Sequence, residues 1–152
     1  MLIHELTADE CVEALERTVL ARLACQRDGQ PYVVPVHLYF DGERRCWYGF
    51  STVGQKIAWM RANPRVCVEI EDITDPDRWI TVVAFGEYEE IADDERSRIE
   101  RERARQLFEE RPEWWLPAAA KTESAEHATP VVYKIRIDRM TGRRAARARA
   151  AH

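Results

Sequence analysis

The sequence lacks long hydrophobic runs, a strong charge of one sign and the common nucleotide-binding motifs. No run of 18 apolar residues is present, so no membrane-spanning helix is expected. The formal net charge is −4 with 33% charged residues, which argues against nucleic acid as a partner. GxGxxG and GxxxxGK[ST] are both missing, which excludes Rossmann and P-loop cradles. The first residues lack the pattern of a signal peptide, and we expect a cytoplasmic protein.

Cysteine and histidine are few and scattered. The four cysteines are Cys11, Cys25, Cys46 and Cys67. They include no CxxC pair and have no histidine at ligand spacing, so we expect reduced core residues and no metal site. With 152 residues the chain is long enough for one hydrophobic core.

Short alternating segments dominate what is present. Thr7 and Glu10 have the spacing of a capping box, which predicts a helix that ends near Arg17. Apolar residues then alternate over 19–26 and 31–40, on either side of Asp28-Gly29. This dipeptide is typical of a two-residue turn, so the sequence predicts a β-hairpin with both apolar sets on one face.

The opposite face of this hairpin differs from ordinary core. The turn places Arg22 across from Pro35, and His37 follows on the same face. Because proline cannot donate to a strand ladder, we expect this face to meet a ligand or a subunit interface. Two roles stay open for Arg22, a second cation for a ligand and a surface ion pair with a nearby acid.

The segment Ser51-Thr52-Val53-Gly54-Gln55-Lys56 lies between a predicted strand, 45–51, and a predicted helix that ends at Asn63-Pro64. A helix N-terminus offers free N–H groups and partial positive charge, and so favours phosphate. Hydroxyls, a glycine and a lysine at this junction suit the same ligand. An ordinary capped surface helix is the alternative on this pattern alone.

Three further strands are predicted, over 66–70, 79–91 and 131–137, with a bulge or bend at Gly86. A charged surface helix is predicted over 93–111. Six short strands with flanking helices favour a small closed or split barrel of mainly β class. We expect residues 1–142 to form this domain and the basic residues 143–152 a flexible tail, with docking on an acidic partner or on the other subunit of a dimer as the alternative.

Four segments, in order along the chain, resemble the pyridoxamine 5′-phosphate oxidase-like split-barrel flavoproteins, and among them the nitroimidazole-resistance-like flavin-nucleotide-binding proteins. These segments are Ala21–Ala24, Asp28–Val36, Ser51–Lys56 and Arg61–Val66. The resemblance implies a six-stranded antiparallel split β-barrel of the FMN-binding type. It also implies a homodimer with one FMN in each of two grooves between the subunits. FAD is the alternative cofactor, because a phosphate cradle accepts it if the adenosine end finds room.

The resemblance also implies where the flavin binds. The phosphate is held by the segment that contains Ser51, Thr52, Gln55 and Lys56. The flavin ring lies over the strand with Pro35, Val36 and His37, and backbone groups of Tyr48, Gly49 and Phe50 flank the ring or the ribityl chain. Trp79 matches a position that closes the groove from the partner subunit. We assign the same task to Trp114 or Trp115 by inference of our own.

The implied activity is that of an FMN-dependent oxidoreductase acting on a small electron-poor molecule. Gly49 stands where many nitroimidazole-resistance proteins carry a histidine, so nitroreductase chemistry does not follow. No second phosphate pocket is recognisable, and vitamin oxidation is not expected. His37 is a candidate proton donor near the ring, an interface hydrogen-bond partner or an exposed strand residue. Alternative functions are a non-catalytic or redox-responsive flavin module and a relative that binds deazaflavin or haem.

Overall fold

The computed structural model describes residues 1–110 and 130–147. The predicted Trp114-Trp115 loop and residues 148–152 of the predicted tail lie outside these ranges. Within them the elements are β1 (Leu2–Glu5), α1 (Ala8–Arg17), β2 (Leu20–Arg27), β3 (Gln30–His37), β4 (Tyr39–Asp41), β5 (Cys46–Thr52), α2 (Gln55–Ala62), β6 (Arg65–Asp75), β7 (Arg78–Glu90), the 3-10 turn η1 (Glu95–Ser97), α3 (Arg98–Glu110) and β8 (Pro130–Ala146).

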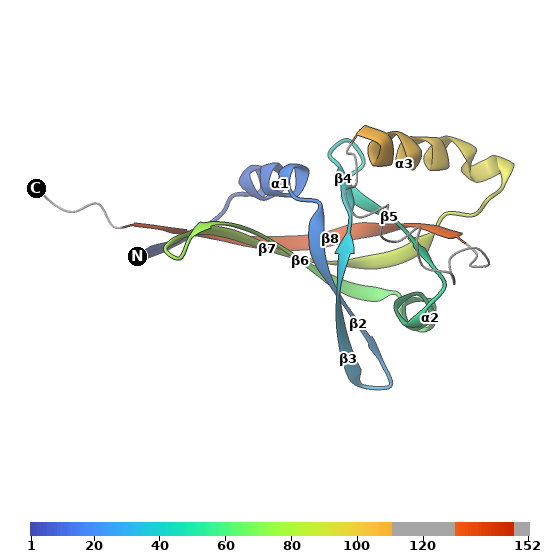
Figure 1. Cartoon of the computed structure of the whole chain (residues 1–152), viewed down its shortest axis with the longest axis horizontal. Coiled ribbons are helices and arrows are strands. Elements are labelled where there is room, and N and C mark those ends of the chain that lie inside the picture. The colour runs from blue at the N-terminus through green and yellow to red at the C-terminus, as the bar shows by residue number, and fades with distance from the viewer. Residues whose placement is uncertain (111–129, 148–152) are drawn as a thin grey trace, which may run out of the picture.

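The strands form one antiparallel sheet in the order β3-β2-β6-β7-β8-β5-β4, and β1 pairs with the far part of β8. Long strands β6, β7 and β8 run through the molecule, with α1 and α3 on one side and the β2–β3 hairpin and α2 on the other (Figure 1). Helices therefore flank a mainly β structure, as the sequence predicts.

The two outer strands of the sheet, β3 and β4, follow each other directly in the chain. Only Leu38 separates them, and its backbone N–H bonds to Val19 O at 2.9 Å. The sheet must therefore curl so that its two ends approach each other, and it stays open because β3 and β4 do not pair. This geometry confirms the antiparallel split barrel.

The strand count is eight among the described residues, and the prediction of six is wrong in two places. The short N-terminal strand β1 carries no clear alternation and was not predicted. Leu38 divides the predicted strand 31–40: its backbone N–H still bonds to Val19 O in the β2–β3 register, whereas residues 39–41 pair with β5 instead.

The other local predictions are largely confirmed. Thr7 N–H donates to Glu10 Oε2 at 2.8 Å and Glu10 N–H donates to Thr7 Oγ1 at 3.3 Å, which completes the capping box of α1. The β2–β3 register pairs Arg22 with Pro35, as the turn requires. The β7–β8 register shifts at Gly86, where a bulge was expected.

The core fills the barrel and the side covered by α1. Its fully buried members include Leu15, Leu23, Leu38, Trp47, Ile57, Met60, Ile70 and Ile135. Outside the barrel, a smaller cluster under α3 joins Ala104 to Cys46, Tyr48 and Ile91. None of the helices in the described ranges is long and apolar enough to cross a membrane.

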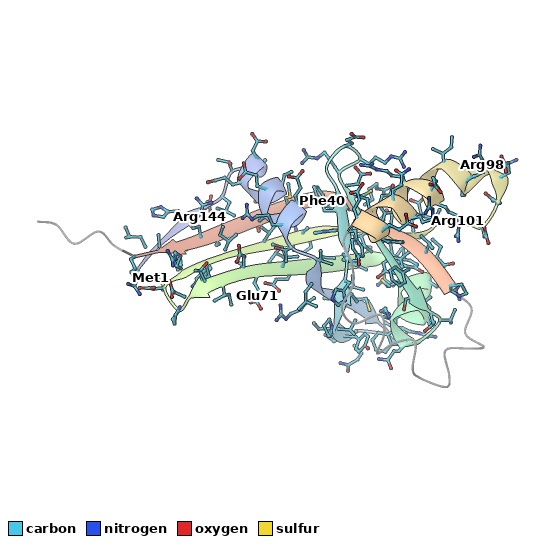
Figure 2. The ribbon with its side chains drawn as sticks, turned by 45° about the horizontal axis from the view of Figure 1, so that its top comes forward. Met1, Phe40, Glu71, Arg98, Arg101 and Arg144 are labelled. Atoms are coloured by element: carbon cyan, nitrogen blue, oxygen red, sulfur yellow. The ribbon has the colours of Figure 1, made fainter. Side chains whose placement is uncertain are left out.

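The sequence prediction places the start of the flexible tail too early in the chain. Strand β8 continues through Ala146, paired with β1 and β7. Arg143 Nη2 lies 3.1 Å from Glu5 Oε1, and Arg144 Nη1 lies 2.9 Å from Glu10 Oε1 of α1. Figure 2 shows Arg144 beside α1. These arginines therefore bind the protein's own acidic side chains, and the prediction is wrong for residues 143–146.

Candidate functional site

The segment singled out in the sequence joins β5 to α2. Residues 51 and 52 end β5 in register with Val131 and Pro130 of β8, and α2 begins at Gln55. Its N-cap, Gly54, makes no side-chain capping bond. The first turn therefore offers its backbone N–H groups and partial positive charge to an external acceptor.

Buried side chains hold α2 in this place. Ile57 and Met60 are fully buried in the barrel core. On the helix side towards β3, Trp59 packs against Tyr32 with ring centroids 5.5 Å apart. Because apolar anchors alternate with polar residues along the helix, Lys56 points towards Ser51 while its neighbour Ile57 enters the core.

Lys56 is a half-buried cation beside this helix start. Its Nζ donates to Ser51 Oγ at 2.7 Å, and Ser51 Oγ donates in turn to Thr52 O at 3.0 Å. Burial lowers the pKa of Lys56. No carboxylate in the described ranges forms an ion pair with it. A cation withdrawn from water without a counterion, next to uncapped N–H groups, has the chemistry to hold an anion.

The remaining part of this segment is open to solvent. Thr52, Val53, Gly54 and Gln55 are all exposed. A Cβ added to Gly54 would meet no atom within 4 Å. We call Ser51–Lys56 with the first turn of α2 the phosphate cradle; it is shielded from solvent on the Lys56 side only.

The opening of the barrel lies along the same end of β5. Residues 49–52 pair with β8 on one side, whereas β4 pairs only with residues 46–48 on the other. The second backbone edge of 49–52 therefore has no strand partner in the described structure. This edge offers peptide N–H and C=O groups to a ligand.

Strand β3, which is predicted to lie under the flavin ring, borders this opening on its other side. Pro35 is exposed, Val36 is buried and His37 is half-buried at the end of β3. Burial lowers the pKa of His37, which favours a neutral imidazole. The next residue, Leu38, has its Cδ2 only 2.9 Å from where a Cβ on Gly49 would lie. The structure thus brings the two predicted segments together at Leu38.

The side chains of β5 next to the cradle are engaged within the protein. Tyr48 is fully buried; its hydroxyl donates to Glu100 Oε1 and accepts from Arg44 Nη1, both at 3.2 Å. Phe50 packs against Phe108 of α3, with centroids 4.9 Å apart. The side chains of Tyr48 and Phe50 thus have partners within the protein, and the backbone groups of this stretch are the ones that face the opening.

Tyr133 packs beneath the opening from within the core, a contact that the sequence analysis missed. Its Cζ would lie 2.5 Å from a Cβ added to Gly49, so its ring fills the space of the missing side chain. Tyr133 is paired with Gly49 across β5 and β8. The alternation of 131–137 indicates that Tyr133 faces inward, but not that it faces Gly49, because pairing partners distant in sequence leave no local signal.

Two predicted ligand contacts do not join the cradle within one chain. Trp79 lies at the start of β7, whereas the cradle is near its end, where Glu90 pairs with Tyr133. The two ends are roughly 35 Å apart along the strand. Arg22 forms ion pairs with Glu69 at 3.5 Å and with Glu71 at 2.7 Å, so the ion-pair alternative describes it. Figure 2 labels Glu71 on the sheet.

Comparisons with known proteins identify a family and two similar proteins. The family model described as pyridoxamine 5′-phosphate oxidase matches residues 7–144. An uncharacterized protein of Rhizobium meliloti (strain 1021) is 37% identical over 148 residues, which are 95% of this chain and 97% of that protein. The crystal structure of an FAD-binding protein from Mesorhizobium loti is 39% identical, has a TM-score of 0.79 and covers 96% of this chain and 100% of its own.

A more distant structure shares the fold. It is a candidate 5-nitroimidazole antibiotic resistance protein from Bacteroides thetaiotaomicron, 18% identical, with a TM-score of 0.66 over 97% of this chain and 93% of its own. At this identity the likeness concerns the split-barrel architecture alone.

Proposed function

The chain belongs to the pyridoxamine 5′-phosphate oxidase family, and from this premise we propose that it binds a flavin nucleotide, FMN, with the phosphate in the cradle of Ser51, Lys56 and α2. The observation that carries the proposal is the half-buried Lys56 ammonium, which has no carboxylate partner in the described ranges. A phosphate dianion supplies the missing negative charge. The ring then lies along the open backbone edge of residues 49–52.

FAD is the second candidate cofactor, and two observations favour it. The Mesorhizobium loti relative, 39% identical, is described as an FAD-binding protein. The exposed side of the cradle, Thr52 to Gln55, leaves room for an adenosine diphosphate extension. FMN has the stronger electrostatic argument, because its phosphate monoester concentrates nearly two negative charges beside Lys56, whereas each phosphate of the FAD diphosphate carries one.

We propose further that the protein is a flavin-dependent oxidoreductase acting on a small electron-poor molecule. A bound flavin supplies the hydride or electron transfer, and the protein supplies binding, orientation and exclusion of water. Lys56 and the start of α2 hold the phosphate. Ser51 orients Lys56, because its hydroxyl accepts from Nζ and donates to Thr52 O. His37, with its lowered pKa, lies on the strand proposed to run under the ring.

The experiment for this function is a spectrum of the purified protein, followed by mass analysis of the small molecule released on denaturation. Flavin absorbance with FMN or FAD in the released fraction is expected. Anaerobic addition of NADH or NADPH should then bleach the flavin bands. Bound flavin that no nicotinamide bleaches would favour a non-catalytic or redox-responsive module, whereas a colourless protein that takes up no flavin contradicts the proposal. Haem or deazaflavin absorbance contradicts it as well.

We also propose a homodimer that completes this site. The strand pairings place four exposed apolar side chains on one face of the sheet, and these are Leu20, Val33, Ile73 and Phe85. A shallow groove of about 400 Å³ between β2 and β7 lies around Phe85 on this face. A second copy on this face would bring Trp79 of one copy towards the cradle of the other, which one chain alone cannot do.

Sedimentation equilibrium tests this assembly. We expect twice the 17.8 kDa mass of one chain. Val33→Glu should dissociate the dimer, because Val33 is 60% exposed in the single chain and a charge would be desolvated in the interface. Glu13→Gln, which changes an exposed residue of α1, is the control. A wild-type protein that sediments at the mass of one chain contradicts the proposal.

A further inference from the structure

Hydrogen bonds and an ion pair connect the C-terminal end of α2 to β7. Arg61, in the last turn of α2, donates from Nε to Glu90 Oε1 and from Nη2 to Glu90 Oε2, the latter at 3.3 Å. Tyr88 Oη donates to the same Oε1 at 2.7 Å. The hydrogen bond from Arg61 lowers the pKa of Glu90, so this carboxylate stays ionised at neutral pH. We call Arg61, Tyr88 and Glu90 the helix anchor.

The helix anchor also reaches β5, the other element that forms the phosphate cradle, through Tyr133 of β8. Tyr88 N–H donates to Pro64 O, just beyond α2, at 2.8 Å. The Tyr88 ring lies 5.4 Å from the ring of Tyr133. Tyr133 in turn packs at Gly49 of β5, two residues before Ser51. Tyr88 therefore lies between α2, which carries Lys56, and β5, which carries Ser51.

Apolar packing and the chain connections to β5 and β6 hold α2 against the core, and Arg61 adds a contact of defined direction. Ile57 and Met60 hold the helix against the core through contacts that have no preferred direction. A two-point guanidinium–carboxylate contact has a fixed geometry and therefore sets rotation and position along the axis. The helix has eight residues and is about 12 Å long, so a change at Arg61 is transmitted to Lys56 as a rigid-body movement.

We propose that Glu90, held by Tyr88, is a positioning residue for phosphate binding, because it fixes α2 so that Lys56 and Ser51 stay in contact at 2.7 Å. This inference rests on the proposed flavin site and names a residue that lies outside it. Glu90 contacts no part of the cradle directly. Its effect reaches the ligand through Arg61 and the helix.

The test compares FMN with riboflavin, which has the same ring system and no phosphate. Wild-type protein should bind FMN more tightly than riboflavin. Glu90→Gln should weaken FMN binding about tenfold and leave riboflavin binding unchanged, because a neutral amide cannot hold the guanidinium as strongly. Tyr88→Phe, which keeps the ring on Tyr133, should weaken FMN binding about threefold.

Glu87→Gln is the matched control. Glu87 is on the same strand and has its own arginine partner, Arg136 of β8, which is not part of α2. Its FMN and riboflavin affinities should equal those of the wild type. Thermal unfolding of each protein without ligand separates a loss of fold from a loss of positioning.

The outcomes distinguish this inference from the proposed function. A wild-type protein that binds FMN no better than riboflavin contradicts the phosphate cradle itself. A wild-type preference for FMN that Glu90→Gln leaves intact contradicts the positioning role alone. If Glu90→Gln weakens the binding of FMN and riboflavin equally, or lowers the melting temperature while FMN is still preferred, Glu90 serves overall stability. Either result also overturns the inference.

Discussion

Replacement of Lys56 by alanine is expected to weaken FMN binding by about 1.5–3 kcal/mol, the range for a hydrogen bond to a charged group. Lys56 is half-buried, donates to Ser51 Oγ at 2.7 Å and has no carboxylate partner in the described ranges. In the variant the phosphate would keep the helix N-terminus and the Ser51 hydroxyl but lose the cation. Isothermal titration with FMN measures the change, which corresponds to roughly 10- to 150-fold in Kd.

Two controls make the Lys56 result specific. Riboflavin affinity should stay unchanged in Lys56→Ala, because riboflavin has no phosphate. Arg17→Ala removes a cation that is exposed at the end of α1, and it should leave FMN affinity unchanged. If Lys56→Ala binds FMN as tightly as the wild type, the phosphate lies elsewhere and the cradle assignment is wrong.

Asp41→Ala should lower the free energy of unfolding by about 1.5–3 kcal/mol, the range for hydrogen bonds to a charged group, because the part-exposed Arg103 can be solvated once Asp41 is gone. Asp41 is 1% exposed. Its Oδ2 accepts a hydrogen bond from Arg103 Nε at 2.8 Å, and its Oδ1 accepts one from Arg103 Nη2 at 3.3 Å. It also accepts backbone N–H bonds from Glu43 at 3.0 Å and Arg44 at 3.2 Å. Its loss therefore weakens both the β4–β5 turn and the docking of α3.

Urea denaturation of a graded series measures this effect. Asp41→Asn keeps an acceptor for the turn and should cost less than Asp41→Ala. Asp72→Ala, at an exposed position of β6, should change stability by no more than about 0.5 kcal/mol. If Asp41→Ala and Asp72→Ala are equally stable, the ion pair between Asp41 and Arg103 contributes nothing to the free energy of unfolding.

The acid range gives an independent check on Asp41. Burial acts to raise the pKa of Asp41, but the hydrogen bonds from Arg103, Arg44 and Glu43 outweigh it and lower the pKa. The stability that Asp41 contributes is thus complete above the unfolded pKa of about 3.9 and is lost as pH falls through the lower native pKa. The difference in stability between the wild type and Asp41→Asn should accordingly narrow below about pH 4.

Local sequence rules predict the β2–β3 hairpin and α1 correctly. The register follows from Asp28-Gly29 because a two-residue turn leaves one pairing that puts both apolar sets on the same face. The cap of α1 follows from Thr7 and Glu10, which are three residues apart. In both cases the interacting groups are close in sequence, so the pattern contains the geometry.

The candidate site is predictable only in part, for the same reason. The cradle lies within six residues, and its hydroxyls, glycine and lysine can be read directly. The helix anchor joins Arg61 to Glu90 across 29 positions, and the Gly49–Tyr133 contact joins two strands that are far apart in sequence. No periodicity within one strand reports its distant partner.

By itself the sequence determines the mainly β class, the hairpin register, the helix start at Thr7 and the chemistry of Ser51 to Lys56. Only the tertiary structure decides that Leu38 divides a long strand and that Arg22 and Arg144 bind the protein's own acids. It also decides that Trp79 and the cradle occupy opposite ends of β7. The physical reason is range: turns, caps and alternation act between near neighbours, whereas strand order, ion pairs and cavity filling depend on where the folded sheet brings distant residues.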